Sequence, residues 1–243
     1  MLSELSLQLL WQSLGDKDTA IIIGGQEARP HSHPYMAYVQ IPTPRPKTCG
    51  GFLVREDFVM TAAHCLGSQI SVILGAHNVS RLERTQQRIP VLRAIPHPRY
   101  NQQNNQNDIM LLQVPTLWSF TRAAPSQLGG PGRGKPSRLP GWRTDTLQDV
   151  WIRVQRGEEC SRLFMFYTDR TQICVGDPRE RKSAFLVRPR GDSGGPLVCN
   201  NVAQGIVSYG KRIGTPPAVF TRISSFLPWI RRTMRRFKEW GLE

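Results

Sequence analysis

Gly191-Asp192-Ser193-Gly194-Gly195-Pro196 is the stretch that points most directly to the fold of this 243-residue chain. Glycines on both sides of a serine allow a tight turn and let main-chain N–H groups converge on one point. Donors arranged in this way stabilise the oxyanion of an acyl-transfer intermediate. In isolation the stretch is equally consistent with a Gly-rich turn that has no chemical role, so its meaning depends on the rest of the chain.

Two further segments supply the groups that a reactive serine needs. They are Thr61-Ala62-Ala63-His64-Cys65 and Asn107-Asp108-Ile109-Met110-Leu111-Leu112. A serine hydroxyl is a poor nucleophile until a base takes its proton, and that base needs an anion to fix its tautomer. Taken by itself, the first segment is better explained by a structural histidine at His64, and the second by a turn at Asp108 that begins a strand. Together with Ser193, in this chain order, they predict a catalytic triad.

The composition narrows the class of protein. Apolar residues make up 39% of the chain, which is enough for a core, and no run reaches the roughly 18 apolar residues of a membrane span. We therefore expect no transmembrane segment. The formal net charge of +14 favours polyanionic partners such as glycans or membranes. The basic residues are scattered and no nucleic-acid motif accompanies them, so we expect no specific nucleic acid.

Short alternating or apolar runs separated by Pro, Gly and charged turns predict an all-β fold. Behind Ser224-Ser225 the apolar spacing changes to that of a capped C-terminal helix. Pro115 to Arg143 contains no credible strand. The expected strands are 35–40, 51–54, 58–61, 71–74, 109–114, 150–154, 172–175, 196–199, 205–209 and 218–221.

The cysteines are typical of an oxidising compartment. Cys49 with Cys65, and Cys160 with Cys174, would close short local disulfide loops. None forms a C-x-x-C pair, so metal-binding spacing is absent. Asn78-Val79-Ser80 is a glycosylation sequon, which fits secretion.

The motifs T-A-A-H-C, D-I-M-L-L and G-D-S-G-G-P resemble those around the catalytic residues of the trypsin/chymotrypsin family, in its order and at about its spacing. Ile22-Ile23-Gly24-Gly25 and Pro34-Tyr35-Met36-Ala37 are similar to the granule-protease branch of leukocytes and mast cells. The resemblance implies two six-stranded antiparallel Greek-key barrels and a C-terminal helix in a protease domain at 22–243. Residues 1–21 are an atypical extension that we expect to be an exposed, disordered tail.

The resemblance also implies residue roles. His64 would be the general base, Asp108 its orienting anion and Ser193 the nucleophile. The backbone N–H groups of Gly191 and Ser193 would form the oxyanion hole. No metal or cofactor is needed.

Activation in this family frees an isoleucine amine, which pairs with the aspartate before the nucleophile and orders the pocket. Ile22 and Asp192 match these two positions. Because Ala20 and Ile21 precede Ile22, the chain as written is zymogen-like.

The specificity pocket follows from the same alignment. Ser183 would form its floor and Ala218 its far wall, while the 208–210 segment, Ser208-Tyr209-Gly210, would offer backbone groups to the substrate. With neither wall acidic, a buried Lys or Arg would lack a counter-charge. Large apolar or aromatic residues are therefore expected before the cleaved bond. The alternative is that residues 208–210 are edge-strand residues without a substrate role.

Two segments depart from the family pattern. Leu186-Val187-Arg188-Pro189-Arg190 inserts residues beside the oxyanion hole; it either bulges outward or places Val187 on the pocket floor. In 115–143, Gly141-Trp142 alone hints at the strand that bears C-x-V-A-G-W-G in the family. Its cysteine, the usual disulfide partner of the Cys199 position, does not occur there, so we expect a second barrel that lacks a strand.

We therefore predict a serine endopeptidase that acts on protein substrates. By resemblance it would be a monomer, secreted or stored in leukocyte granules, with serpin-type inhibitors and anionic glycans as partners. Two alternatives stay open: a catalytically impaired cationic antimicrobial or glycan-binding protein on this scaffold, and a chain too unstable to fold. The C-terminal helix bears a basic face that is either simply solvated or binds membranes or glycans: Arg231, Arg232, Arg235, Arg236 and Lys238.

Overall fold

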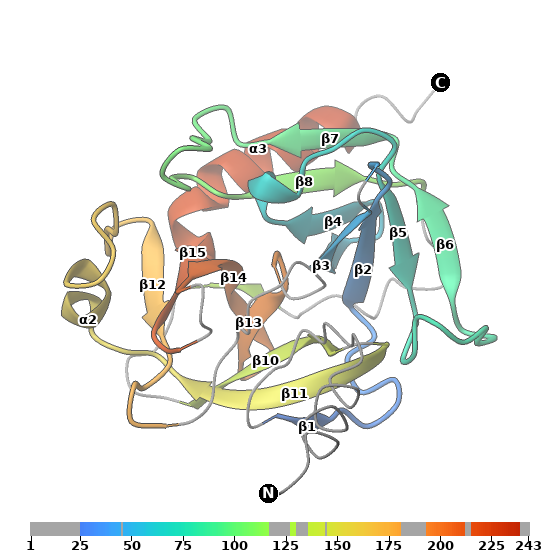
Figure 1. Ribbon diagram of the computed structural model, residues 1–243. Helices are drawn as coiled ribbons and strands as arrows, with labels where there is room; N and C mark the ends of the chain where they lie inside the picture. Colours follow the sequence, from blue (N-terminus) through green and yellow to red (C-terminus); the bar gives the residue numbers. More distant parts are fainter. Residues whose placement is uncertain are drawn as a thin grey trace, which may run out of the picture.

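Two β-sheets and a C-terminal helix form the part of the chain that the computed structural model describes (Figure 1). It comprises residues 25–44, 46–116, 127–129, 136–143, 145–180, 193–211 and 215–238. The predicted all-β architecture with a C-terminal helix is confirmed. Within the described ranges the sheets contain seven and eight strands rather than six each.

The seven-stranded sheet is antiparallel throughout, and its segments 51–53, 58–61 and 109–112 are fully buried. Phe52, Phe58, Met60 and Leu111 pack in its interior without solvent exposure. Such burial on both faces explains why these segments are continuous apolar runs. In spatial order the strands are β6 (Gln87–Pro90), β5 (Ser71–Leu74), β2 (Met36–Ile41), β3 (Lys47–Arg55), β4 (Phe58–Thr61), β8 (Met110–Gln113) and β7 (Arg93–Pro96).

The eight-stranded sheet combines the second half of the chain with the short N-terminal strand β1. Along its main path the pairs are antiparallel, whereas β9 (Gln127–Leu128) pairs with β14 in parallel. The path runs through β1 (Gln26–Glu27), β11 (Thr146–Arg153), β10 (Pro136–Arg143), β13 (Pro196–Cys199), β14 (Val202–Gly210), β15 (Ala218–Arg222) and β12 (Gln172–Val175).

Strand β10 corrects the prediction that the second barrel lacks a strand. All eight of its residues pair with β11, and Arg138 also pairs with Val198 of β13. Leu139 and Trp142 are each 1% exposed. Two prolines conceal this strand in the sequence, but neighbours on both sides and buried side chains outweigh its poor local propensity.

The C-terminal helix α3 (Leu227–Lys238) follows the 3₁₀ turn η3 (Ile223–Phe226) and packs on the seven-stranded sheet. Trp229 and Ile230 are buried, and the Phe237 ring lies 6.2 Å from that of Phe58. The predicted serine cap is wrong in detail. Ser225 lies within η3 and its Oγ donates to the carbonyl of Arg170 at 2.6 Å. The short helix α2 (Gly157–Ser161) was not predicted.

Candidate active site

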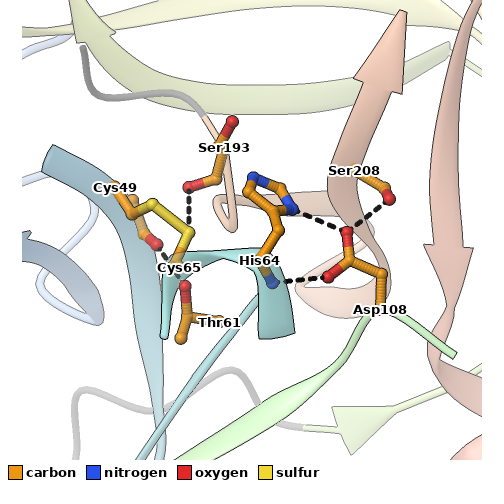
Figure 2. Close-up of a disulfide and its surroundings, with 8 residues drawn as sticks. Cys49, Thr61, His64, Cys65, Asp108, Ser193 and Ser208 are labelled. Atoms are coloured by element: carbon orange, nitrogen blue, oxygen red, sulfur yellow. Dashed lines mark hydrogen bonds and ion pairs between the residues drawn. A yellow bond between two sulfur atoms is a disulfide. The ribbon is translucent and has the colours of Figure 1, made fainter. Parts of the chain in front are cut away.

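His64 stands on the 3₁₀ turn η1 (Ala63–Cys65), directly after the buried strand β4. The Cys49–Cys65 disulfide ties this turn to β3, with the two Cα atoms 6.3 Å apart. Thr61 Oγ1 donates to the carbonyl of Gly50 at 2.8 Å. The small residues at 62 and 63 let the chain turn in the core. Backbone and disulfide together fix where the imidazole lies (Figure 2).

Asp108 is completely buried two residues before the start of β8, and its carboxylate faces His64. One oxygen accepts the backbone N–H of His64 at 2.9 Å. The other lies 2.7 Å from His64 Nδ1 and accepts the hydroxyl of Ser208 at 2.5 Å. Thr221 Oγ1 donates to the Asp108 carbonyl at 2.8 Å. Three contacts to the carboxylate, from the backbone N–H of His64, its Nδ1 and the Ser208 hydroxyl, compensate for the burial of this anion.

These contacts set the charge of Asp108 and the tautomer of a neutral His64 ring. Burial by itself raises the pKa of Asp108, but attraction to His64 and the hydrogen bonds from His64 and Ser208 outweigh it, so the pKa lies below its ordinary value. An ionised carboxylate only accepts hydrogen bonds. The proton of a neutral His64 ring is therefore assigned to Nδ1, which leaves the lone pair of Nε2 for a base.

The lowered pKa of Asp108 predicts a loss of stability in acid. In the unfolded chain an aspartate binds its proton near about pH 4, whereas the native carboxyl binds it at lower pH. The stabilisation is complete above the unfolded pKa and is lost as the pH falls through the native pKa. We expect urea unfolding between about pH 5 and pH 3 to show a steeper fall in unfolding free energy for the parent than for Asp108→Asn. Equal slopes would contradict the assignment.

Ser193 lies on the turn that leads into β13, and Figure 2 shows the His64 ring between it and Asp108. Its carbonyl accepts the backbone N–H of Gly50 at 2.8 Å and lies 3.8 Å from Cys65 Sγ. Gly194 N–H donates to Val207 O at 2.9 Å. The nucleophile candidate is thus held by both sheets at once.

Gly194 is required at this turn for two reasons. Its φ of +86° lies in the left-handed region, and a Cβ would lie 2.1 Å from Thr61 Oγ1 and 2.5 Å from Gly50 O. We expect Gly194→Ala to lower the free energy of unfolding by about 3 kcal/mol, measured in urea. As a control, Gly205→Ala meets side chains at 3.2 Å or more without positive φ and should cost less. An equal or larger loss in the control would contradict the prediction.

The predicted pocket segments meet at one edge of the site. Ser208, Tyr209 and Gly210 end β14, and Gly210 pairs directly with Ala218 of β15, which is 3% exposed. Tyr209 packs edge-on against Phe164, with ring centroids 5.4 Å apart. Ala218, proposed from the sequence as a pocket wall, places no charge at this edge. Ser208 faces Asp108, a contact that its sequence context does not reveal.

Several predicted features lie outside the described residues. These are the N-terminal extension at 1–21, Ile22, Ser183, the insert 186–190, Gly191 and Asp192. Among the described residues, the structure brings together His64, Asp108 and Ser208 through hydrogen bonds, with Ser193 on the adjoining turn.

Four of the five cysteines form two disulfides, and the fifth is Cys199. Cys49–Cys65 and Cys160–Cys174 are disulfides, the latter with Cα atoms 5.7 Å apart. Cys199 is buried and belongs to neither. The atoms of Cys49, Cys65 and His64 lie within 4.8 Å of one another, but the two sulfurs are bonded to each other and offer no thiolate for a metal.

At the Asn78 sequon, the Asn78 side-chain oxygen accepts the backbone N–H groups of Ser80 and Arg81 at 3.0 and 3.2 Å.

The sequence of this chain matches a known protein family. The family model described as Trypsin matches residues 22–230. The chain belongs to the trypsin family. The segments at 74–78, 173–177 and 199–203 predict cathepsin G as a relative within it, and the comparisons confirm this. Human cathepsin G is 59% identical, with 89% of each chain covered.

Other relatives of this trypsin-family chain extend the likeness. Mouse cathepsin G is 56% identical, covering 96% of this chain and 93% of the relative, and human granzyme B is 49% identical, covering 95% and 98%. A solved structure described as "Structure of GrC" superposes with a TM-score of 0.80 at 45% identity, covering 88% of this chain and all of that one. The chain is a serine-type endopeptidase. No helix in the described ranges is both long and apolar enough to cross a membrane.

Proposed function

We propose that His64, Asp108 and Ser193 carry out peptide-bond hydrolysis through an acyl-enzyme. The supporting observation is the 2.7 Å contact between His64 Nδ1 and the buried, triply hydrogen-bonded Asp108. His64 Nε2 takes the Ser193 proton as the oxygen attacks the substrate carbonyl, and then returns it to the leaving amine. A water molecule then attacks the ester of the acyl-enzyme, with His64 again taking the proton and returning it to the Ser193 oxygen. Asp108 holds the ring and stabilises its charged form.

The N–H groups of Gly191 and Ser193 are proposed to stabilise the oxyanion. The Ile22 amine, freed by cleavage, is proposed to pair with Asp192 and order the pocket. The protease domain is proposed to span 22–243. These roles rest on the match to the family motifs.

The experiment uses the chain trimmed to begin at Ile22. A peptide p-nitroanilide with Phe before the cleaved bond should be hydrolysed, and a fluorophosphonate probe should label Ser193. Ser193→Ala should abolish both. Turnover without Ser193 labelling would reject the assignment of the nucleophile. Absence of both, with salt-sensitive heparin binding intact, would favour a cationic binding protein on this scaffold.

The proposed specificity is for large apolar or aromatic residues such as Phe, Tyr, Leu and Met, with Ser183 and Ala218 as uncharged pocket positions. A Lys side chain buried beside Ala218 would have no counter-charge, a cost of several kcal/mol. The backbone of Ser208-Tyr209-Gly210, at the end of β14, is proposed to bind the substrate strand.

Ala218→Glu tests the pocket wall. A carboxylate at this buried position should raise the ratio of kcat/KM for Lys over Phe substrates by roughly 100-fold. Ala218→Gln, of the same size but uncharged, is the control. An equal ratio in the two variants would place Ala218 outside the pocket.

The proposed setting is secretion or storage in leukocyte granules, with serpin-type inhibitors and anionic glycans as partners and a monomeric state. The exposed arginines of α3 and the net charge of +14 support the glycan partner. Asn78 is the proposed glycosylation site. Peptide mapping of the secreted protein with and without glycosidase treatment tests it.

A further inference from the structure

His97 joins the C-terminal helix to the seven-stranded sheet. It directly follows β7, a strand that lies close to α3 in Figure 1. Its ring packs in T-shaped geometry against Phe226 of η3 and Trp229 of α3, with centroids 5.2 and 5.0 Å away. Its backbone N–H donates to the carbonyl of Ile109 at 2.9 Å, next to the buried Asp108. A single residue therefore connects the docked helix with the segment that carries the aspartate of the proposed triad.

The ring of His97 makes a hydrogen bond that only its neutral form can make. The backbone N–H of Arg99 donates to His97 Nδ1 at 3.2 Å. A neutral imidazole accepts a hydrogen bond at one nitrogen, whereas both nitrogens of an imidazolium are donors. The hydrogen of the neutral ring is therefore assigned to Nε2, and protonation of Nδ1 would break the contact with Arg99.

Two positive charges face the ring. Arg99 lies on the same turn as His97, and Arg232 lies on α3. Phe226, Trp229 and Arg232 follow one another at intervals of three residues, so they share the face of η3 and α3 that packs against His97. A proton on His97 would thus add a third positive charge at the point where the helix docks.

No negative charge of the described residues offsets this repulsion. The third neighbouring segment, at 107–109, contributes Asp108, but its carboxylate is bonded to His64. No carboxylate of the described ranges forms an ion pair with His97. Burial, followed by repulsion from Arg99 and Arg232, holds the pKa of His97 below its ordinary value. Contacts and charges both favour the neutral ring in the docked helix.

We propose that His97 is an acid-sensitive contact, which stabilises the docking of α3 on the seven-stranded sheet while neutral and weakens it when protonated. Once the helix is released, the ring binds its proton near about pH 6.5, whereas in the docked state it binds at lower pH. The stabilisation is complete above about pH 6.5 and is lost as the pH falls through the native pKa. The inference concerns the docking of the helix and does not rest on the endopeptidase function.

The test follows the opening of α3 by hydrogen–deuterium exchange and mass spectrometry. The full chain carries Ser193→Ala to prevent self-digestion, and exchange times are scaled for the intrinsic rate at each pH. Between about pH 7.5 and about pH 5, the protection of peptides covering 230–238 should fall about 5-fold or more. The peptide covering β4 is the internal reference. A fall of the same size there would mean that the whole fold loosens, and would overturn the proposal.

Two histidine variants assign the effect to one ring. His97→Gln cannot become charged, so its protection should change by less than about 2-fold over the same range. His31→Asn is the control, because His31 is exposed and its φ of +60° is a conformation that asparagine tolerates. This variant should keep the full fall of the parent. Persistence of the fall in His97→Gln would overturn the proposal.

A pair of arginine variants tests the contact with the helix. Arg232→Gln removes a charge that faces His97 and should reduce the acid-induced fall to about half. Arg231→Gln removes the same charge from the neighbouring exposed position, which points in another direction around α3, and should leave the fall unchanged. Equal effects of the two would mean a general response to helix charge and overturn the proposal. So would greater protection of the parent in acid, which would mean that the aromatic rings stabilise a charged imidazole.

Discussion

Asp108→Asn is expected to lower kcat by about 10⁴-fold with little change in KM. The parent carboxylate accepts from His64 Nδ1 at 2.7 Å and so keeps the hydrogen on that nitrogen. An amide nitrogen at the same place is itself a donor. The ring would then carry its hydrogen on Nε2, where it could no longer accept the Ser193 proton. The measurement is steady-state hydrolysis of the Phe p-nitroanilide by the trimmed enzyme.

Asp57→Asn is the matched control. Asp57 accepts from Arg55 Nη2 at 2.7 Å, away from the proposed triad, so the same change of chemistry should leave kcat within 2-fold. If Asp108→Asn retained more than about a tenth of the activity, or if Asp57→Asn lost as much, the role assigned to Asp108 would be wrong.

Ser137→Cys is expected to form a third disulfide with Cys199 and to stabilise the protein strongly. The register Arg138 to Val198 puts Ser137 directly opposite Cys199, and both are buried. Opposed residues on antiparallel strands have Cα atoms about 4.5–5.5 Å apart, within the disulfide range of roughly 4.4–6.8 Å. Closing a loop of roughly 60 residues contributes about 4 kcal/mol in the chain-entropy account. Urea unfolding with and without reductant measures it.

Ser137→Ala is the control for this substitution, because it removes the hydroxyl without adding sulfur. The cysteine variant should lose the Cys199 thiol that the denatured parent presents to a thiol reagent, and reduction should return its stability to near that of the control. A thiol count equal to that of the parent would show that the two positions do not meet.

This pair also explains one failure of sequence reasoning. In the motif C-x-V-A-G-W-G the cysteine stands four residues before the glycine, and Ser137 stands four before Gly141. With the cysteine replaced and prolines at 136 and 140, the segment has the composition of a loop. Its strand identity comes from β11 and β13, which lie on either side of it. Local propensity cannot report a pairing made by distant segments.

Other parts of the fold were predictable because their signal is local. The boundaries of β4, β5, β12 and β13 match the sequence-based strands, since each is a short apolar run between turns. Strands β6 and β7 were missed. Their residues are mostly polar or partly exposed, and they are strands because β5 and β8 pair with them.

For the candidate active site, the order His64, Asp108, Ser193 and the small residues around them were sufficient to propose the chemistry. This is because a triad needs particular side chains on particular turns, and those turns restrict the neighbouring sequence. The sequence could not reveal that Ser208, a hundred residues away, donates to Asp108, or that Thr221 holds its carbonyl. Those contacts exist only because β14 and β15 bring their buried side chains to the seam with the first sheet. The reacting residues require particular neighbours in the sequence and can therefore be recognised from it. The residues that set their charge and position come from distant segments and are brought to them by tertiary packing.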